Sequence, residues 1–379
     1  MICDVVVAGG GLAGSAAAIG LARAGRHAVL IERETGPHDK VCGEFLSYEA
    51  CHYLSALGIN PEALGAIALH GVRLVKGTQC AQASLPFRAL SLSRRVLDEE
   101  LLNAAIASGV DVRRGLRVKA LTRSGTGWQA MLDQGPPLEA RAAFLATGKH
   151  DLKDLKRPAG SQPDLIGFKM YWQLSAKQAL SLGGHVELAL FPGGYAGLEP
   201  VEGNRANLCL LVQRGHFGGL ENSWDALLDT IKTTCPHVAH RLEGAKPLLA
   251  KPLAISAIPY GYVLDGFERR DDQPWRLGDQ AAVIPSFSGD GMSIALHSAR
   301  LASDFYMRGE QAHHYHARLA SDVHGQIARA TRLSKTLVNP WGQRAAITLA
   351  RLMPPVLTGI ASWTRISDRA LERGISRKA

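Results

Sequence analysis

The feature that most constrains the fold of this chain is a glycine-rich turn near its start. Residues 4–8 form a short apolar run rich in valine, which is typical of a buried parallel strand. Gly9, Gly11 and Gly14 follow in a Gly-x-Gly-x-x-Gly pattern, and residues 15–24 are small enough for a closely packed helix. The order of strand, glycine-rich turn and helix predicts the first half of a nucleotide-binding β-α-β unit.

Each part of this unit has a separate role in such a site. The first glycine allows the tight turn, the second lets backbone approach a pyrophosphate, and the third lets the helix pack on the strand. The N-terminus of the helix that follows offers free N–H groups and partial positive charge to phosphates. Residues 27–31 form the next strand. Glu32 at its end, followed by Arg33, is placed to accept hydrogen bonds from a ribose diol.

Composition places the chain among globular proteins. It has 379 residues and a formal charge of +9, from 43 Lys and Arg against 34 Asp and Glu. This length indicates two domains or one large discontinuous domain. The six cysteines form no Cys-x-x-Cys pair, which fits a reducing cytoplasm and predicts neither disulfides nor a metal site. No apolar run is long enough for a membrane span, because residues 346–363 are interrupted by Arg351 and Pro354-Pro355.

Positive charge is concentrated in the last fifth of the chain. Residues 311–379 contain eleven Lys and Arg against Asp322, Asp368 and Glu372. This region forms either a solvated helical face or a docking surface for anionic lipid or an acidic carrier protein. Nucleic acid is not predicted as a partner. We therefore expect a cytoplasmic protein, with the inner membrane face as a candidate peripheral location.

Hydrophobic periodicity indicates which parts of the rest of the chain form sheet and which form helices. Residues 166–263 consist of glycine-punctuated apolar stretches, which indicate a mostly antiparallel sheet. We expect helices over residues 97–108, 224–233 and 294–308, strands over 110–113, 143–146, 186–191 and 208–212, and a mainly helical C-terminus broken at Pro340 and Pro354-Pro355.

Two further motifs, together with the glycine-rich turn, resemble those of one known superfamily. Residues 93–98 read Ser-Arg-Arg-Val-Leu-Asp and contain an Arg-x-x-x-Asp element. Residues 277–282 read Leu-Gly-Asp-Gln-Ala-Ala, and residues 289–292 read Gly-Asp-Gly-Met. In this order the motifs resemble the FAD-dependent aromatic hydroxylase and geranylgeranyl reductase superfamily, which has the p-hydroxybenzoate hydroxylase fold. The resemblance spans residues 9–292, which is most of the chain.

This resemblance implies that the chain binds FAD. Arg94 would reach the pyrophosphate, Asp279 would bind the ribityl chain, and Val118 would lie against the adenine. The helix start at Gly291 and Met292 would face the flavin pyrimidine, where its N–H groups stabilise negative charge. The expected cofactor-binding residues are Gly9, Gly11, Leu12, Ala13, Gly14, Glu32, Arg33, Cys42, Gly43, Arg94, Val118, Gly148, Gly278, Asp279, Gly289, Gly291 and Met292.

The segment Lys40-Val41-Cys42-Gly43 resembles an element that geranylgeranyl reductases and related enzymes place beside the flavin ring. Cys42 is then a candidate to tune the flavin or act as a weak acid. It could equally be a small buried apolar residue in a tight loop. Gly43 would allow close approach of backbone to the ring.

Other segments bear on the branch of the superfamily. The halogenase motif Trp-x-Trp-x-Ile-Pro has no counterpart around Trp172, so halogenation is not favoured. The reductase motif Tyr-x-Trp-x-Phe-Pro corresponds to residues 195–200, in which Gly197 and Glu199 replace the tryptophan and phenylalanine. Glu199, and Asp290 beside the second motif, are departures to which the sequence assigns no role. Thr147 stands where hydroxylases carry an aspartate linked to FAD and NADPH.

The predicted architecture is an α/β fold. A Gly-x-Gly-x-x-Gly, Rossmann-like FAD domain carries an inserted, mostly antiparallel substrate sheet, and a helical C-terminus follows. The discontinuous FAD domain is expected over residues 1–75, 90–160 and 265–310, the substrate sheet over 76–89 and 161–264, and the basic helical region over 311–379.

The leading functional prediction is an NAD(P)H-driven monooxygenase that hydroxylates an aromatic or polyketide-like small molecule in secondary metabolism. The first alternative is a flavin-dependent reductase of carbon–carbon double bonds in a lipid or polyketide. The second alternative is a non-catalytic flavin-binding partner protein. FAD would be the resident cofactor, and NADPH or NADH would bind only transiently.

Overall fold

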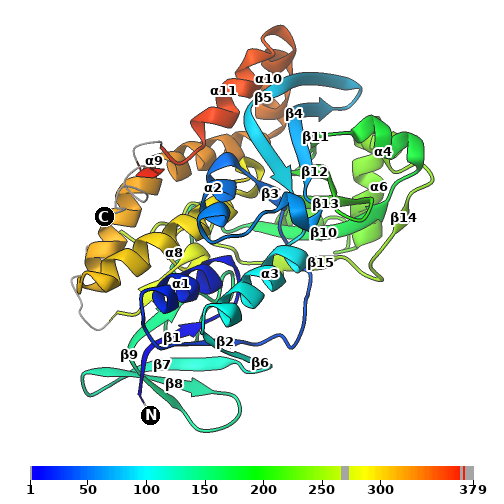
Figure 1. Cartoon of the computed structure of the whole chain (residues 1–379). Coiled ribbons are helices and arrows are strands. Elements are labelled where there is room, and N and C mark those ends of the chain that lie inside the picture. The colour runs from blue at the N-terminus through cyan, green and yellow to red at the C-terminus, as the bar shows by residue number, and fades with distance from the viewer. Residues whose placement is uncertain (1, 266–272, 368–369, 372–379) are drawn as a thin grey trace.

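The first of two sheets is built around the predicted β-α-β unit (Figure 1). The structure, a computed structural model, describes residues 2–265, 273–367 and 370–371. Five strands of this sheet pair in parallel, and β7, β8 and β9 form an antiparallel meander at one side. The strand order is β6-β2-β1-β9-β8-β7, with β16 also paired to β9. The strands are β1 (Cys3–Ala8), β2 (Ala28–Glu32), β6 (Asp111–Arg114), β7 (Val118–Ser124), β8 (Gly127–Leu132), β9 (Leu138–Leu145) and β16 (Trp275–Arg276).

Strand β1 is apolar throughout because both of its faces are buried. Val5 and Val7 pack with the helices, whereas Val6 and Ala8 pack in a separate cluster with side chains of β7 and β8. A buried parallel strand therefore appears in the sequence as a continuous apolar run rather than an alternating one. The helices that gather beside this sheet are α1 (Leu12–Arg23), α2 (Tyr48–Ala56), α3 (Arg94–Ala107) and α8 (Gly291–Met307).

Helix α3 begins three residues before the predicted start at Leu97. Ser93 caps it, since its Oγ accepts a hydrogen bond from Val96 N at 3.4 Å. A serine at this position satisfies one of the free N–H groups of the first turn. The cap places Arg94 at the first helical position, where it faces the glycine-rich turn.

The second sheet has nine strands and is mostly antiparallel, as predicted. Only β4 and β11 pair in parallel among its described strands. The order is β14-β10-β13-β12-β11-β4-β5-β3, with β15 paired to β10. The strands are β3 (Phe45–Leu46), β4 (Ile67–Lys76), β5 (Gln79–Ser91), β10 (Leu165–Gln173), β11 (His185–Phe191), β12 (Gly194–Val201), β13 (Arg205–Gln213), β14 (Lys246–Pro247) and β15 (Leu253–Ser256).

This sheet corrects the domain boundaries predicted at residues 75/76 and 89/90. Strand β4 begins at Ile67 and β5 ends at Ser91, so both belong to the second sheet over their full lengths. Strand β4 pairs with β5 on one side and with β11 on the other, and β11 lies more than 100 residues further along the chain. Local periodicity does not report such a distant pairing. The predicted ranges 265–310 and 311–379 include residues 266–272, 368–369 and 372–379, which lie outside the described residues.

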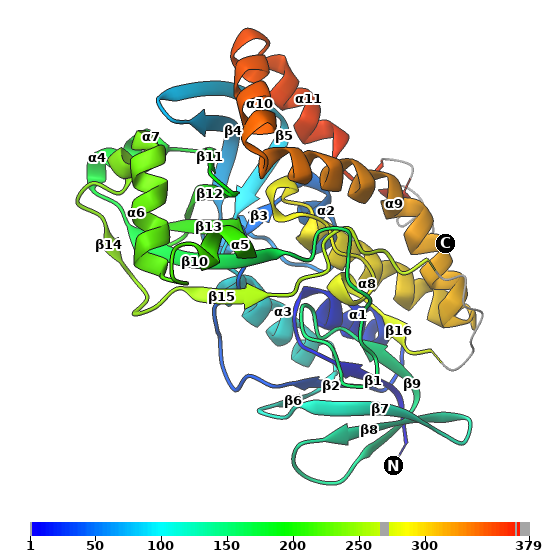
Figure 2. The same ribbon diagram turned by 180° about the vertical axis from the view of Figure 1, so that it is seen from behind.

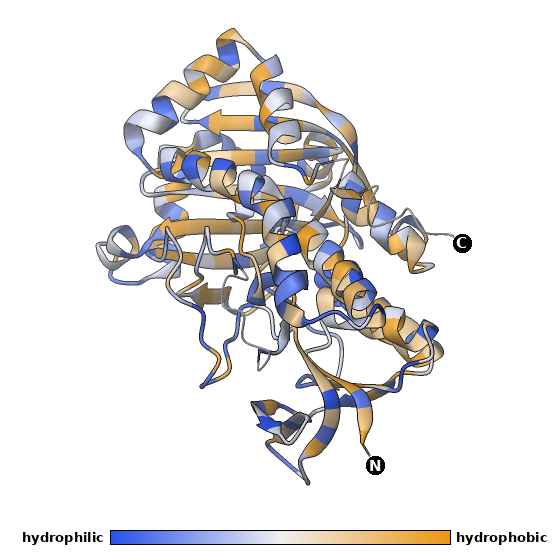
Figure 3. Cartoon of the chain, turned by 90° about the vertical axis from the view of Figure 1, so that its left-hand side faces the viewer, coloured by the Kyte–Doolittle hydropathy of each residue, from blue (hydrophilic) through white to orange (hydrophobic). Residues whose placement is uncertain are grey.

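One face of the second sheet is covered by short helices, and the other faces the C-terminal helices (Figure 2). Figure 3 shows that the sheet strands and the helices around the first sheet are largely hydrophobic. The covering helices are α4 (Ala176–Leu182), α5 (Arg214–Gly218), α6 (Trp224–Thr234) and α7 (Pro236–Arg241), and the C-terminal helices are α9 (Ala312–Leu337), α10 (Pro340–Leu352) and α11 (Pro355–Trp363).

Prolines at their first positions set the starts of α10 and α11, as predicted. No described helix is by itself both long and apolar enough to cross a membrane. Helices α10 and α11 reach the required length and composition only as a pair, and a bend of 118° separates them.

A buried carboxylate joins the second sheet to its covering helices, and we expect it to make stability pH-dependent. Glu187 on β11 accepts hydrogen bonds from Arg73 at 2.9 Å, from Arg241 at 2.8 Å and from His237 at 2.8 Å. Burial raises the pKa of Glu187, but the hydrogen bonds from His237 and Arg241 outweigh it and lower this pKa to about 2. The folded-state pKa thus lies below that of the unfolded chain. Ionised Glu187 and its hydrogen-bond donors therefore stabilise the folded state above about pH 4.5, and this contribution is lost as the pH falls toward 2.

The contribution is expected to be about 3 kcal/mol in the free energy of unfolding. Urea unfolding at several pH values should show a shallower acid-side slope for Glu187→Gln than for wild type. Glu243→Gln, which alters an exposed carboxylate, should keep the wild-type slope. Identical slopes for Glu187→Gln and wild type would show that this cluster does not control acid stability.

Candidate active site

A single large cavity lies between the two sheets and reaches from the glycine-rich turn to the second sheet. Its volume is about 900 Å³. The sequence-predicted cofactor residues come from distant parts of the chain, and all of them except Gly14 line this cavity. The lining residues are Gly9, Gly11, Leu12, Ala13, Glu32, Arg33, Cys42, Gly43, Arg94, Val118, Gly148, Gly278, Asp279, Gly289, Gly291 and Met292.

Gly14 has a packing role behind the cavity wall. A Cβ atom at Gly14 would lie 1.9 Å from the carbonyl oxygen of Gly9. Gly9 itself has a φ of +108°, and a Cβ there would lie 2.5 Å from the carbonyl oxygen of Ala146. Glycine is thus required at both positions, because the turn, α1 and the end of β9 approach one another too closely for any side chain.

The carboxylate at the end of β2 is held by backbone N–H groups. Glu32 Oε2 accepts a hydrogen bond from Gly10 N at 2.7 Å, and Oε1 accepts one from Glu34 N at 2.9 Å. These bonds fix the carboxylate at the cavity wall, where each oxygen keeps acceptor capacity for a ribose hydroxyl. Arg33 beside it forms an ion pair with Glu34 at 3.0 Å.

Two cations lie beside the glycine-rich turn. Asp98 binds Arg94 through two hydrogen bonds of 2.8 Å and binds Lys40 at 2.7 Å. The position of a Cβ at Gly11 is 3.4 Å from Arg94 Nη2 and 3.7 Å from Lys40 Nζ. The Arg-x-x-x-Asp element therefore works as a unit in which the aspartate orients the arginine. The net charge of this cluster and the start of α1 both favour a pyrophosphate in this part of the cavity.

The cavity wall fits FAD where backbone must approach the cofactor. No described atom lies within 4 Å of a Cβ built at Gly43, Gly148 or Gly291, so a side chain at these positions would fill the cavity instead of meeting protein. Gly291 also begins α8, whose N-terminal N–H groups border the same space. The cavity therefore has one end with the side-chain cations Arg94 and Lys40, suited to the nucleotide, and another end with backbone N–H donors at the start of α8, suited to the flavin.

Asp290, the departure beside the second motif, is part of the protein's own packing. It is buried and forms an ion pair with Arg365 at 2.6 Å. Burial raises the pKa of Asp290 to about 7, and Arg365 acts in the opposite direction. Arg365 also donates to the carbonyl oxygen of Ser288. This contact joins the segment after α11 to the start of α8.

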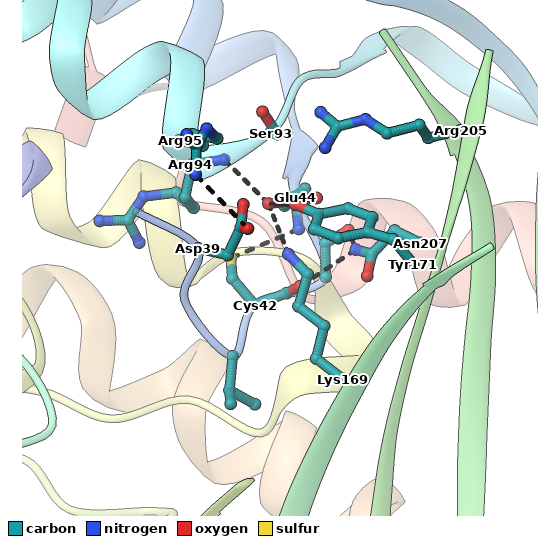
Figure 4. A network of polar contacts seen from close by, with 12 residues as sticks. Asp39, Cys42, Glu44, Ser93, Arg94, Arg95, Lys169, Tyr171, Arg205 and Asn207 are labelled. Atoms are coloured by element: carbon teal, nitrogen blue, oxygen red, sulfur yellow. Dashed lines mark hydrogen bonds and ion pairs between the residues drawn. The ribbon is translucent and has the colours of Figure 1, made fainter. Parts of the chain in front are cut away.

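A buried polar network that sequence reasoning missed lies at the flavin end of the cavity (Figure 4). Glu44 forms an ion pair with Lys169 at 2.5 Å and accepts hydrogen bonds from Tyr171 Oη at 2.7 Å and Arg94 N at 2.8 Å. Glu44 has a φ of +65°, which for a residue with a side chain costs roughly 1–2 kcal/mol. Burial raises the pKa of Glu44, whereas Lys169 and Tyr171 lower it. The network therefore holds this loop in a strained conformation next to Cys42 and Gly43.

One signal in the sequence could have indicated this network. Lys169 is the single charged residue in the apolar strand Leu165–Gln173, and a lysine buried in a sheet requires an acidic partner. The partner could not have been identified, because Glu44 lies on a distant loop.

Cys42 is held by the backbone around it. Its Sγ accepts a hydrogen bond from Glu44 N at 3.3 Å. Asn207 on β13 donates to the carbonyl oxygens of Cys42 and Gly43, each at 3.0 Å. Lys149 donates to Val41 O at 2.6 Å, so the first sheet also fixes this loop. Cys42 lines the cavity, and its chemical role stays a prediction.

Glu199 is a second carboxyl group on the cavity wall. The register of β10, β13 and β12 places Tyr171, Asn207 and Glu199 side by side across three strands. Glu199 is only 3% exposed, and its Oε1 has no hydrogen-bond partner among the described residues. Burial is the main cause that raises the pKa of Glu199 well above its usual range, and the nearby carboxylate of Glu44 acts in the same direction. Burial therefore favours the protonated, neutral form of this side chain.

Part of the cavity wall is aliphatic. Strands β4, β5, β11 and β15 and helix α11 contribute aliphatic side chains to the same cavity as Glu199. They form a space suited to a hydrocarbon group rather than a polar metabolite. These residues are Val72, Leu74, Leu85, Val186, Leu188, Leu253, Ile255, Leu357 and Ile360.

Comparisons with known proteins agree with this site. Residues 2–146 match a family described as an FAD binding domain. The menaquinone reductase of Mycolicibacterium smegmatis is 27% identical over 325 residues, which cover 81% of this chain and 76% of that protein. Digeranylgeranylglycerophospholipid reductase 1 of Methanopyrus kandleri is 26% identical over 324 residues, which cover 79% of each chain. The myxobacterial chondrochloren halogenase superposes with a TM-score of 0.75 at 19% identity, over 98% of this chain and 95% of that one.

The halogenase comparison shows the fold alone at this level of identity. The α/β architecture with two mixed sheets and a helical C-terminus is that of the FAD-dependent hydroxylases and halogenases. The FAD-binding-domain match and the similarity to these reductases and to this fold agree with the superfamily resemblance that the motifs predicted. The chain is an FAD-dependent oxidoreductase.

Proposed function

We propose that the protein reduces a carbon–carbon double bond in an isoprenoid lipid. The observation that carries this proposal is the buried carboxyl group of Glu199, which lies with many aliphatic side chains on the wall of the cavity that continues from the FAD cradle. Burial raises the pKa of this group, which favours its protonated form. The names of two relatives support the proposal, since menaquinone and digeranylgeranylglycerophospholipid are both lipids with isoprenoid chains. We place this reaction ahead of the hydroxylation that was the leading prediction from the sequence.

Different residues of the chain would have different roles in such a reduction. When bound in its reduced form, FAD supplies two electrons and one hydrogen to a double bond. The second hydrogen is a proton, which Glu199 holds on its carboxyl group and donates to the neighbouring carbon. The resulting carboxylate regains a proton from water before the next turnover. The aliphatic wall orients the hydrocarbon chain and excludes water.

The Glu44 network holds the loop that forms the cavity wall near Glu199. Lys169 stays paired with Glu44, so it positions the Cys42–Glu44 loop and reduces the cost of a transient charge on Glu199. Arg94, Lys40 and the start of α1 would hold the pyrophosphate, and Glu32 the adenosine ribose. NADPH, NADH or a separate reductase as the source of electrons stays a prediction.

Oxygen dependence separates this proposal from the hydroxylase. We expect the FAD-loaded protein, reduced with dithionite under nitrogen, to convert geranylgeraniol or menaquinone to products heavier by two hydrogens per reaction. Fragmentation in the mass spectrometer should locate these hydrogens in the isoprenoid chain, since dithionite alone reduces the quinone ring of menaquinone. A product that forms only with oxygen and carries one added oxygen atom would instead support the monooxygenase acting on an aromatic or polyketide-like substrate. No product from either probe with or without oxygen would favour a flavin-binding partner protein.

A further inference from the structure

Helices α10 and α11 form the end of the molecule that lies furthest from the β7–β8 hairpin (Figures 1 and 2). Their inner side packs on β4 and β5, with Ile347, Ala350 and Leu357 buried. Helix α11 also lines the cavity, through Leu357, Ile360 and Ala361. Helix α11 therefore forms part of the wall between the cavity and the outside.

The outer side of the same pair is also apolar. Of the eleven exposed large hydrophobic residues among the described ones, five fall within residues 341–363. Trp341 is 75% exposed and Leu352 76% exposed, and hydrophobic segments surround the tip between the helices (Figure 3). Single exposed apolar residues are ordinary, but five of them on one helix pair mark a candidate interaction surface. We call Trp341, Leu349, Leu352, Met353 and Trp363 the docking surface.

The charge around the docking surface has one sign. Residues 323–367 contain no Asp or Glu and carry six Lys and Arg. Arg344 lies 5.3 Å from the centre of the Trp341 ring, and Arg329 lies 5.3 Å from that of Trp363. Tryptophan rings beside guanidinium groups are suited to the boundary between lipid headgroups and acyl chains. A complementary partner must be both anionic and able to accept exposed leucine, methionine and tryptophan.

We propose that α10 and α11 dock the protein on the surface of an anionic lipid bilayer, with the docking surface inserted among the headgroups. The 118° bend folds α11 back from α10, so the exposed Leu352 and Met353 at the bend can enter the headgroup layer without the pair spanning the bilayer. An acidic carrier protein would match the arginines but not the five exposed apolar side chains. This proposal does not depend on the proposed reaction, because binding to vesicles requires neither substrate nor turnover. It would place the wall of the cavity directly on a source of lipid.

Vesicle co-sedimentation of the FAD-loaded protein tests the proposal. The wild type should sediment with vesicles of phosphatidylcholine and phosphatidylglycerol and only weakly with phosphatidylcholine alone. The variant Trp341→Ser/Leu352→Ser/Met353→Ser should bind the mixed vesicles at least about tenfold more weakly, because each exposed apolar side chain loses its transfer into the interface. Arg344→Gln/Arg351→Gln should lose about fivefold per arginine on mixed vesicles, and added salt should weaken wild-type binding.

Matched controls remove equivalent side chains elsewhere on the surface. Leu180→Ser alters an 85% exposed leucine on α4, and Arg141→Gln alters an exposed arginine on β9. Both should bind vesicles as the wild type does, and all variants should retain FAD absorbance, since each changed side chain is exposed. The proposal is overturned if the wild type does not sediment with mixed vesicles or if the triple variant binds them like the wild type. It is also overturned if Leu180→Ser loses as much vesicle affinity as the triple variant does. Binding to an acyl carrier protein without binding to vesicles would assign the surface to an acidic protein instead.

Discussion

Replacing Gly14 with alanine is expected to abolish retention of FAD and to destabilise the protein by about 1–3 kcal/mol or more. The new methyl group would lie 1.9 Å from the carbonyl oxygen of Gly9, so α1 would have to move away from the turn. Gly9 cannot yield, because the end of β9 packs against it on the other side. Flavin absorbance after gel filtration and the thermal midpoint measure the two effects. Gly20→Ala in the same helix meets only the side chain of Ser303, at 3.3 Å, and should keep its FAD.

Gly11→Ala separates cofactor binding from folding. Its backbone, with a φ of −79°, accepts alanine, and the new Cβ would meet only Arg94 and Lys40 at ordinary contact distances. We expect unfolding free energy to change little and the dissociation constant for FAD to rise at least about tenfold, which corresponds to about 1.4 kcal/mol. Flavin titration of the stripped protein is the measurement. Wild-type affinity in Gly11→Ala would mean that the turn does not approach a pyrophosphate.

The contrast between these two glycines illustrates what sequence can predict. The β-α-β unit has local causes: an apolar strand buried on both faces, a turn that only glycine permits, and a small-residue helix. Its two strands were therefore predicted to within one residue at each end, whereas the helix begins at Leu12, three residues before the predicted start. The boundary at β4 was wrong, because the partner strand β11 is distant in sequence and no local pattern reports it. Helix α3 began earlier than predicted because the cap at Ser93 was overlooked.

The parts of the candidate site that come from contiguous sequence motifs were predictable. The parts formed by contacts between segments distant in the sequence were not. Cofactor residues from three motifs reach one cavity because each motif sits at the end of a strand or the start of a helix. The Glu44 network joins a loop to a strand 127 residues later, so its members carry no shared sequence pattern. Glu199 was noticed only as a carboxylate in an unexpected place. Its position beside Asn207 and Tyr171 became visible only from the strand register in the structure.

Glu199→Gln is expected to lower the rate of double-bond reduction by roughly 10²–10⁴-fold, the usual contribution of a positioned proton donor. Glutamine keeps the shape and the neutral charge of the protonated carboxyl group but holds no transferable proton. FAD affinity and unfolding free energy should therefore stay near wild type. Rapid mixing of the reduced, FAD-loaded protein with geranylgeraniol under nitrogen measures the rate. Glu243→Gln, far from the cavity on an exposed helix end, is the matched control and should react at the wild-type rate.

The pH profile of the same reaction tests the role of Glu199 as a donor rather than a structural element. The donor must be protonated, so the wild-type rate should be high below the pKa of Glu199 and fall as the pH rises through it. Because burial raises this pKa, the fall should come well above the pH at which an exposed glutamate ionises. Glu199→Gln should lose this descending limb, and Glu199→Asp should regain part of both the rate and the limb. A Glu199→Gln variant with wild-type rate and profile would show that the proton comes from another group.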